Sequence, residues 1–369
     1  MITITGVGLV SCLGNNISQN FENFQKGICG SKEIMGFCTQ KYHIKSAYEI
    51  PTKLHENNIK SWIISVINEA LNDSKDFIDE NTIIIVGTGL RNIRKFEDSV
   101  ITDCTITSTD LDFKEFLLTC FPNVKDVISI TNACSSSLYA LSLGCDLLNL
   151  KLATKVIIVG ADCISQTMHA LDDRVAISKP TIIQSFDKMR KGVLLGEGAA
   201  AIILKNQNQE FKNLDEIYIK SIALSCDARH ETQPWSEMIE KTIKTAIAQA
   251  KLSPQNIDMI FAHGTGTILN DIAEGKAMSN IFHDCKKTYI TGLKPMIGHT
   301  SGASGLMGVI AGYLSLKSNK TIPLINMKEV IDEAKKLHFV YKATSQELAT
   351  VQINAFGFGG LNAVAIIGK

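Results

Sequence analysis

Short runs of β-branched and other apolar residues alternate with longer helical patterns along nearly the whole chain of 369 residues. The runs typical of strands are residues 2–10, 82–86, 126–130, 155–159, 199–204, 217–224, 257–262, 288–291, 351–355 and 363–367. Helical spacing of apolar residues occurs at 60–72, 134–150, 235–251, 271–282 and 305–318. Strands separated by helices are typical of a mostly parallel sheet that is covered on both faces. The sequence therefore predicts an α/β protein.

The order of these segments repeats along the chain. Each half has an opening strand, a strand that ends in a Gly-Thr-Gly loop (residues 87–89 and 264–266), a strand that leads into a small-residue turn and a helix, and a closing pair of strands. A polar stretch near residues 205–216 separates the two halves. We therefore predict two similar α/β halves, residues 1–205 and 206–369.

Composition excludes several classes of protein. The 37 basic and 37 acidic residues balance, which argues against nucleic-acid or anionic-membrane binding over the whole surface. No apolar run reaches the ~20 residues of a membrane span, and the first residues lack a signal-peptide pattern. The ten cysteines are scattered without a CxxC pair, so we expect no metal site and a cytoplasmic protein with reduced thiols.

The most informative stretch is VISITNACSSSLYAL at residues 127–141. An apolar run gives way to small and polar residues, one cysteine, three serines and then helical spacing. This pattern puts Cys134 at a strand-to-helix corner, where free backbone N–H groups and the helix dipole favour a thiolate. We therefore predict that Cys134 is a nucleophile, whereas most of the other nine cysteines are expected to be structural.

Three further segments are candidate partners of this cysteine. His263 in FAHGTGT (261–267) and His299 in KPMIGHTSGASG (294–305) each follow a predicted strand. Because α/β sheets bind ligands at the carboxyl ends of their strands, the two histidines are expected to converge. The glycine-rich segment NAFGFGGLN (354–362) offers backbone N–H groups to an oxyanion, although a tight β-hairpin has a similar sequence.

Five ordered blocks resemble the signature segments of the β-ketoacyl-acyl carrier protein synthases, in particular the elongating Cys-His-His type of the thiolase superfamily. The blocks are TNACSS (131–136), SFDKMRKGVLLGEG (185–198), HGTGT (263–267), KPMIGH (294–299) and NAFGFGG (354–360). The resemblance extends from the first strand to the last residue. It implies a thiolase fold, in which the two α/β halves form a five-layered αβαβα core.

The resemblance also implies a role for each matched residue. Cys134 would take an acyl chain from an acyl carrier protein, and malonyl-carrier protein would then lose CO2 and attack the resulting thioester. His263 and His299 would donate hydrogen bonds to the malonyl thioester, and Lys294 would support the site electrostatically. Phe358 would act as a gate, and its backbone N–H would form an oxyanion hole with that of Cys134. The other matches are Thr265 and Thr267, which would bind the phosphopantetheine arm, and Leu90 and Val193, which would line the acyl pocket. No cofactor is expected beyond the phosphopantetheine that the carrier protein brings.

Several positions depart from the family pattern. Gly308 stands where the fatty-acid enzymes have a glutamate, Lys191-Gly192-Val193 replaces Asp-Gly-Phe, and Arg229 replaces a tyrosine. The segment 91–123 also looks short for the family. These changes favour a type II polyketide or polyene ketosynthase over a fatty-acid enzyme, and they leave the core chemistry intact.

Two other functions compete with an elongating synthase. A non-catalytic, chain-length-setting subunit of a ketosynthase heterodimer would resemble the family but lack the nucleophile. A degradative thiolase would need a second cysteine near the C-terminus, where the last cysteine is Cys285. Family members are dimers, so we expect a homodimer or a heterodimer with a related chain-length subunit. Lys53 and Lys60 are candidates for docking the carrier protein, although solvated surface charge explains them as well.

Overall fold

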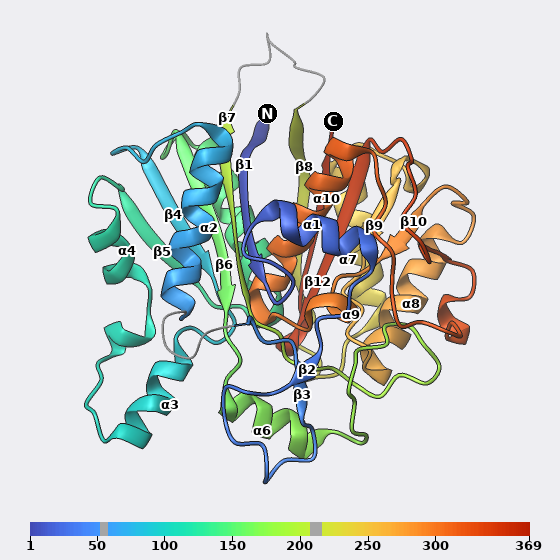
Figure 1. The fold of residues 1–369 in the computed structure, drawn as a ribbon. Helices are drawn as coiled ribbons and strands as arrows, with labels where there is room; N and C mark the ends of the chain where they lie inside the picture. The colour runs from blue at the N-terminus through green and yellow to red at the C-terminus, as the bar shows by residue number, and fades with distance from the viewer. Residues whose placement is uncertain (52–57, 207–215) are drawn as a thin grey trace.

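The computed structural model describes residues 1–51, 58–206 and 216–369. Its strands are β1 (Ile2–Ser11), β2 (Lys32–Glu33), β3 (Ser46–Ala47), β4 (Thr82–Gly87), β5 (Asp126–Ile130), β6 (Lys155–Asp162), β7 (Gly198–Asn206), β8 (Ile217–Cys226), β9 (Met259–Phe261), β10 (Tyr289–Thr291), β11 (His338–Phe339), β12 (Thr350–Gly357) and β13 (Leu361–Gly368). All except β2 and β3 form one sheet in the order β11-β10-β9-β12-β13-β8-β1-β7-β6-β4-β5 (Figure 1).

The same strand order occurs twice in this sheet. The order β1-β7-β6-β4-β5 in one half matches β8-β13-β12-β9-β10 in the other, with the same parallel and antiparallel neighbours. Thr3 and Ile4 of β1 pair with Tyr218 and Ile217 of β8 and join the two halves edge to edge. The predicted pair of similar halves is confirmed. Residues 207–215 of the predicted polar linker lie outside the described residues, so the boundary at 205/206 stays a prediction.

The prediction of a mostly parallel sheet is wrong, because the sheet is mixed. The outer strands of each half run parallel, as β4 does with β5 and β6. The central strands are antiparallel, from β6 and β7 through β1 and β8 to β13 and β12. One physical reason is the short turn Phe358–Gly360 between β12 and β13, since a tight hairpin permits only antiparallel pairing.

The helices cover the sheet on both sides and fill its middle. They are α1 (Ile17–Lys26), α2 (Ile59–Ser74), α3 (Ile93–Thr102), α4 (Lys114–Cys120), α5 (Ser136–Asn149), α6 (Gln166–Val175), α7 (Ser236–Gln249), α8 (Ile268–Phe282), α9 (Lys294–Ile297) and α10 (Ser304–Ser318). Helices α5 and α10 contact each other and both halves of the sheet, while α2 packs on the first half and α7 on the second (Figure 1). The result is the five-layered αβαβα arrangement of the thiolase fold.

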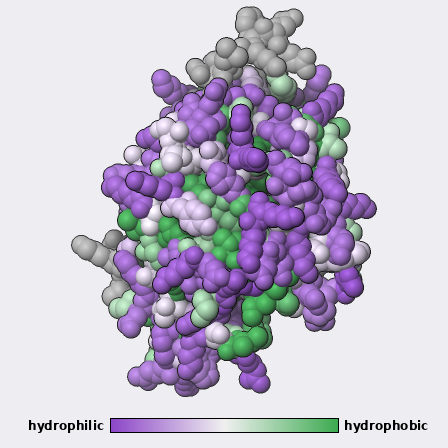
Figure 2. All heavy atoms as spheres, turned by 90° about the vertical axis from the view of Figure 1, so that its right-hand side faces the viewer, coloured by the Kyte–Doolittle hydropathy of each residue, from purple (hydrophilic) through white to green (hydrophobic). Residues whose placement is uncertain are grey.

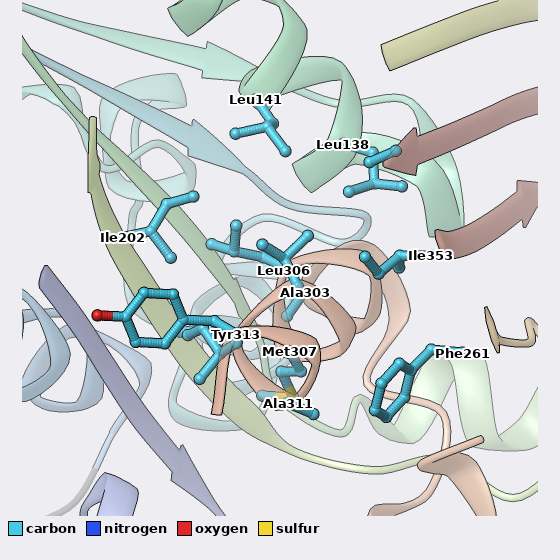
Figure 3. Packing of buried hydrophobic residues seen from close by; sticks show 14 of the residues in the cluster. Leu138, Leu141, Ile202, Phe261, Ala303, Leu306, Met307, Ala311, Tyr313 and Ile353 are labelled. Atoms are coloured by element: carbon cyan, nitrogen blue, oxygen red, sulfur yellow. The ribbon is translucent and has the colours of Figure 1, made fainter. Parts of the chain in front are cut away.

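Three large apolar cores lie between the layers among the described residues, and a small fourth cluster is formed by Ile34, Ala47, Ile164 and Leu195. The middle core joins α5 and α10 to both half-sheets through side chains such as Leu138, Leu306, Ile202 and Ile353 (Figure 3). A second core lies between α2 and the first half-sheet, and a third between α7, α8 and the second. Burying one Leu or Ile side chain fully stabilises the folded chain by ~1.5–3 kcal/mol. These cores therefore hold in place the strand ends from which the site residues come.

All ten predicted strands and all five predicted helices are present, with small shifts at their ends. Helix α2, for example, begins at a capping box between Asn58 and Ser61 and ends at Lys75, which adopts the left-handed conformation with φ 54°. The sequence reasoning missed α1, α3, α4, α6 and α9. Each of these has ten residues or fewer, too few turns to produce a clear helical period.

The face of the molecule on the side of α8 and β10 is mainly hydrophilic (Figure 2). Seen from the side of α8 and β10, a smaller group of apolar residues lies near the middle of a charged and polar face (Figure 2). In the part of the chain that the structure describes, every helix is too short or too polar to cross a membrane. All ten cysteines are free.

Candidate active site

Cys134 lies in a sharp turn between β5 and α5. The turn is the 3-10 segment Ala133–Ser135, and Ala133 has a positive φ of 48°, which is costly for a residue other than glycine. Ser136 stabilises the turn, because its hydroxyl accepts from the Asn132 N–H at 2.8 Å and donates to the Ala133 carbonyl at 2.6 Å. The predicted strand-to-helix corner is thus present, and the serines after the cysteine help to hold it.

The two histidines converge on this cysteine as the sequence predicts. Nε2 of His299 lies 3.1 Å from the Cys134 sulfur. The ring centroids of His263 and His299 are 5.4 Å apart, with the rings nearly perpendicular. His263 follows β9 directly, whereas His299 comes after the short helix α9, and its backbone N–H donates to the Leu194 carbonyl at 2.9 Å.

Lys294 fixes the proton position of His263. Its ammonium lies 3.2 Å from Nδ1 of His263 and donates to the His263 carbonyl at 2.5 Å. An ammonium can only donate, so Nδ1 accepts and the neutral imidazole carries its proton on Nε2. His263 therefore presents an N–H to the site.

Sequence reasoning missed Glu274, a fully buried residue of α8. Its carboxylate accepts from the backbone N–H groups of His263 at 2.7 Å and Gly264 at 2.8 Å, and from the Asn354 amide at 3.0 Å. It connects the loop of His263 and Gly264 to Asn354 of β12. The sequence contained one indication of this role, because Glu274 is an acidic residue on the otherwise buried face of the helix that follows HGTGT. Asp271, one turn earlier, is buried as well and accepts from the backbone N–H of Phe186 at 2.6 Å.

The electrostatics of the site follow from its burial. Burial lowers the pKa values of His263 and His299 well below the usual 6.5, and the Lys294 ammonium lowers them further. Burial also lowers the pKa of Lys294 to about 8, although Glu274 opposes that shift. At pH 7 both imidazoles are therefore neutral and the lysine is mostly charged.

The expectation that Cys134 favours the thiolate is not met at rest. Burial raises the pKa of Cys134 to about 11, more than the nearby Lys294 ammonium and the Phe358 N–H lower it. The cysteine is accordingly a thiol at pH 7. The sequence pattern identified the helix start but gave no measure of how fully the sulfur is removed from water.

The glycine-rich segment forms the hairpin between β12 and β13, and it also reaches the nucleophile. The backbone N–H of Phe358 is a hydrogen-bond donor to the Cys134 sulfur. Gly357 packs so closely that an added Cβ would lie 3.3 Å from the backbone nitrogen of Cys134. The N–H groups predicted for the oxyanion hole therefore lie together, and the Phe358 side chain is 54% exposed above them.

The predicted substrate-binding residues lie on segments that adjoin those of the catalytic residues, and their binding roles stay predictions. The hydroxyls of Thr265 and Thr267 are 2.8 Å apart at the start of α8. Val193 is partly buried against the middle core and precedes Leu194, whose carbonyl binds the His299 backbone. Leu90 is partly buried, and its backbone N–H donates to Asp162 at 2.9 Å.

Two of the departures from the family pattern have a visible counterpart. Gly308 and Lys294 line one small buried cavity of about 20 Å³, together with Thr300, Ser304 and Asn354. That volume is enough for one water molecule. Arg229 is exposed and stacks on Trp235 at 4.9 Å from the ring centroid.

The lysine pair proposed for docking is only partly described. Lys53 lies outside the described residues. The Lys60 ammonium lies 5.0 Å from the centre of the Phe116 ring, at the start of α2. Among the described residues, no three His, Cys, Asp or Glu side chains are grouped so that they would hold a metal ion.

Sequence comparison identifies relatives over the entire length. Residues 126–210 match the profile of the beta-ketoacyl synthase N-terminal domain, and residues 217–328 match that of the C-terminal domain. The 3-oxoacyl-[acyl-carrier-protein] synthase 2 of Coxiella burnetii is 27% identical, and the alignment covers 100% of this chain and 98% of that protein. The synthase 1 of Buchnera aphidicola is 26% identical, covering 100% and 99%.

Solved structures agree with this result. The ishigamide ketosynthase/chain length factor has a TM-score of 0.87 at 25% identity, covering 100% of this chain and 98% of its own. A beta-ketoacyl synthase from Burkholderia phymatum has the same TM-score at 22% identity, covering 100% and 99%, and supports the fold alone.

Proposed function

Because the chain belongs to the β-ketoacyl synthase family, we propose that it joins an acyl group held on Cys134 to a malonyl unit by decarboxylative Claisen condensation. The observation that carries the proposal is the contact of 3.1 Å between the Cys134 sulfur and Nε2 of His299, with His263 and Lys294 next to it. A nucleophile and a neutral base, both partly exposed, and a buried, charged lysine are thus gathered in one site.

The first step transfers the acyl group to the enzyme. Cys134 attacks the carbonyl carbon of an acyl thioester, its proton moves to Nε2 of His299, and the negative charge forms on the carbonyl oxygen. The N–H groups of Cys134 and Phe358 stabilise this oxygen; losing one such donor typically costs ~3–4 kcal/mol. The bond between the acyl carbon and the sulfur of the donor thioester then breaks, and His299 returns the proton to the departing thiolate.

The second step forms the carbon–carbon bond. The carboxylate of a malonyl thioester leaves as CO2, and its electron pair forms an enolate whose oxygen lies between the two histidines. His263 donates its Nε2–H. His299 donates a second hydrogen bond after its proton has moved, through water, from Nδ1, where it lies while Nε2 acts as the base, to Nε2. The enolate carbon attacks the acyl group on Cys134, the thioester bond breaks, and the Cys134 thiolate that leaves takes up one proton from water.

The thioesters are expected to arrive on an acyl carrier protein, through its phosphopantetheine arm. The relatives from Coxiella and Buchnera support this, because their names describe synthases that act on the acyl-carrier protein. Thr265 and Thr267 bind the arm, Phe358 gates the pocket, and Leu90 and Val193 line it. No further cofactor enters these steps.

We infer a type II polyketide or polyene pathway rather than fatty-acid synthesis. The structural similarity to the ishigamide ketosynthase/chain length factor supports this inference, as do Gly308 and Val193. The same relative supports assembly with a second subunit, either identical or of the chain-length type. A cytoplasmic location stays a prediction from the sequence.

Reconstitution tests the proposal directly. The purified chain, alone and with its candidate partner subunit, is mixed with acyl-carrier and malonyl-carrier thioesters. Intact-mass spectrometry should detect a β-ketoacyl-carrier product and an equal amount of CO2. Cys134→Ala should abolish this product without changing the melting temperature by more than a few degrees. In Cys134→Ala only the partner subunit can supply a nucleophile. Condensation that persists in this variant would indicate that the present chain is a non-catalytic chain-length subunit instead.

A further inference from the structure

Asp162, the last residue of β6, is fully buried, and its carboxylate is surrounded by hydrogen-bond donors. It accepts from the Thr88 hydroxyl at 2.7 Å and from the backbone N–H groups of Gly89 and Leu90 at 2.9 Å each. A fourth donor is the backbone N–H of Gly302. All four donors are neutral groups, and they come from two loops far apart in the sequence.

These two loops carry parts of the proposed active site. Leu90, predicted to end the acyl pocket, lies in the first loop, and Gly302 lies three residues after His299 in the second. We call residues 88–91 the pocket loop and residues 299–302 the histidine loop. Asp162 is therefore hydrogen-bonded to both the loop that carries the proposed pocket wall and the loop that carries His299.

Both loops are bent into conformations that side chains rarely adopt. Arg91 has φ 53° in the pocket loop and Ser301 has φ 45° in the histidine loop, while Ala133 has φ 48° just before the nucleophile. Strained residues of this kind persist only where the surroundings determine their conformation. The Thr88 hydroxyl contributes, because it also accepts from the Arg91 N–H at 2.8 Å.

The three loops are in direct contact, so a shift in one moves the others. A Cβ added at Gly89 would lie 2.2 Å from the Ser301 hydroxyl and 3.3 Å from the Ala133 carbonyl oxygen. A Cβ added at Gly302 would lie 2.4 Å from the Gly89 nitrogen and 3.0 Å from the Asp162 carboxylate. The loops have no free space in which to adjust separately.

We propose that Asp162 is a positioning residue that fixes the pocket loop against the histidine loop, and so sets the acyl pocket wall and the place of His299 beside Cys134 together. The inference rests on the proposed function for the identity of the acyl pocket. A purely structural buried carboxylate would affect only the amount of folded protein, whereas this position links acyl-chain length to the reactivity of the cysteine.

Alkylation of Cys134 tests the proposal without carrier protein or condensation. Rates are measured by mass spectrometry with N-alkyl iodoacetamides whose alkyl chains grow from methyl to dodecyl. The variant Asp162→Asn keeps the shape but turns an amide N–H₂ toward donors that need an acceptor. Asp146→Asn, the same change at an exposed site of α5, is the matched control.

We expect the wild type and Asp146→Asn to share one dependence of rate on chain length. In Asp162→Asn the ratio between the fastest and the slowest reagent should fall at least fivefold, because the wall near Leu90 is no longer fixed. Loss of folded protein alone would slow every reagent by the same factor and leave this ratio unchanged. An unchanged ratio in folded Asp162→Asn, or a wild-type rate that does not depend on length, would overturn the proposal.

A second pair of variants covers the case in which Asp162→Asn does not fold. Thr88→Val removes one of the four donors and should lower the ratio in the same direction, and Thr88→Ser, which keeps the hydroxyl, should restore it. If Thr88→Val and Thr88→Ser show the same ratio between the fastest and the slowest reagent, the positioning role of Asp162 is contradicted. The alkylation assay contains no malonyl thioester, so its result does not depend on condensation. A chain that fails to condense in the reconstitution experiment, but whose variants change the alkylation ratio as expected, would refute the proposed function and leave the role of Asp162 standing.

Discussion

Replacing each histidine by alanine should separate the two steps of the reaction. Sequence alone gives His263 and His299 one shared role in decarboxylation. The structure distinguishes them, because Nε2 of His299 is the nitrogen 3.1 Å from the Cys134 sulfur. We therefore expect His299→Ala to impair both acyl loading and decarboxylation, and His263→Ala to impair mainly decarboxylation.

The magnitude follows from the buried thiol. With the pKa of Cys134 raised to about 11, ionising it at pH 7 spans about four pH units, or ~5 kcal/mol. A positioned base that takes the proton during attack typically contributes 10²–10⁴-fold, so His299→Ala should slow loading by about that factor. His263→Ala should change loading by less than about tenfold, while either variant should slow decarboxylation by ~10²–10³-fold through a lost donor.

Rapid-quench mass spectrometry measures both steps. Loading is the rate at which the Cys134 peptide gains the acyl mass, and decarboxylation is CO2 release from malonyl-carrier protein after loading is complete. His283→Ala, an exposed histidine with 42% of its side chain accessible, controls for the general effect of the substitution. Loading that falls equally in His263→Ala and His299→Ala, or that stays normal in His299→Ala, would refute the reasoning.

Three further predictions concern the same site and the core. Alkylation of Cys134 by iodoacetamide should rise by about sixfold from pH 7 to 8, because its pKa is about 11 and about half of the Lys294 charge is lost by pH 8, and a plateau below pH 8 would contradict this. Above pH 8 the increase should become less steep, since Lys294, with a pKa of about 8, loses the charge that stabilises the thiolate. Lys294→Met should slow alkylation at pH 7 by roughly threefold to tenfold in kinetic assays, and a faster reaction would reverse the sign that we assign to its charge. Leu306→Ala in the middle core should lower the free energy of unfolding by ~2–5 kcal/mol in denaturant titrations, whereas Leu150→Ala, 69% exposed, should change it by less than about 0.5 kcal/mol.

The sequence predicts the elements of this fold better than their pairing. Strands such as β4, with Ile83, Ile84 and Ile85 in succession, are recognisable because both of their faces are buried. Strand direction is not local information, and the antiparallel centre depends on pairs such as Ile4 with Ile217, more than two hundred residues apart. The assumption of parallel pairing failed for that reason.

The candidate site shows the same division. Cys134, His263 and His299 lie in motifs that end strands or begin helices, so their convergence is predictable from the sequence. Asp162 gives no such signal, because its partners at residues 88–90 are more than seventy residues away and most of them are backbone N–H groups. The pKa of Cys134 was expected in the wrong direction, since burial depends on packing from the whole fold.

Peptide mapping after incubation with an acyl-carrier thioester tests the central claim most directly. The account predicts one acyl group per chain, on the tryptic peptide 126–151, and none in Cys134→Ala. Because this peptide also contains Cys145, fragment ions should place the acyl group on Cys134 and not on Cys145. The account would be contradicted by an acyl group on a different residue, or by the absence of any adduct under conditions in which a known ketosynthase is fully loaded.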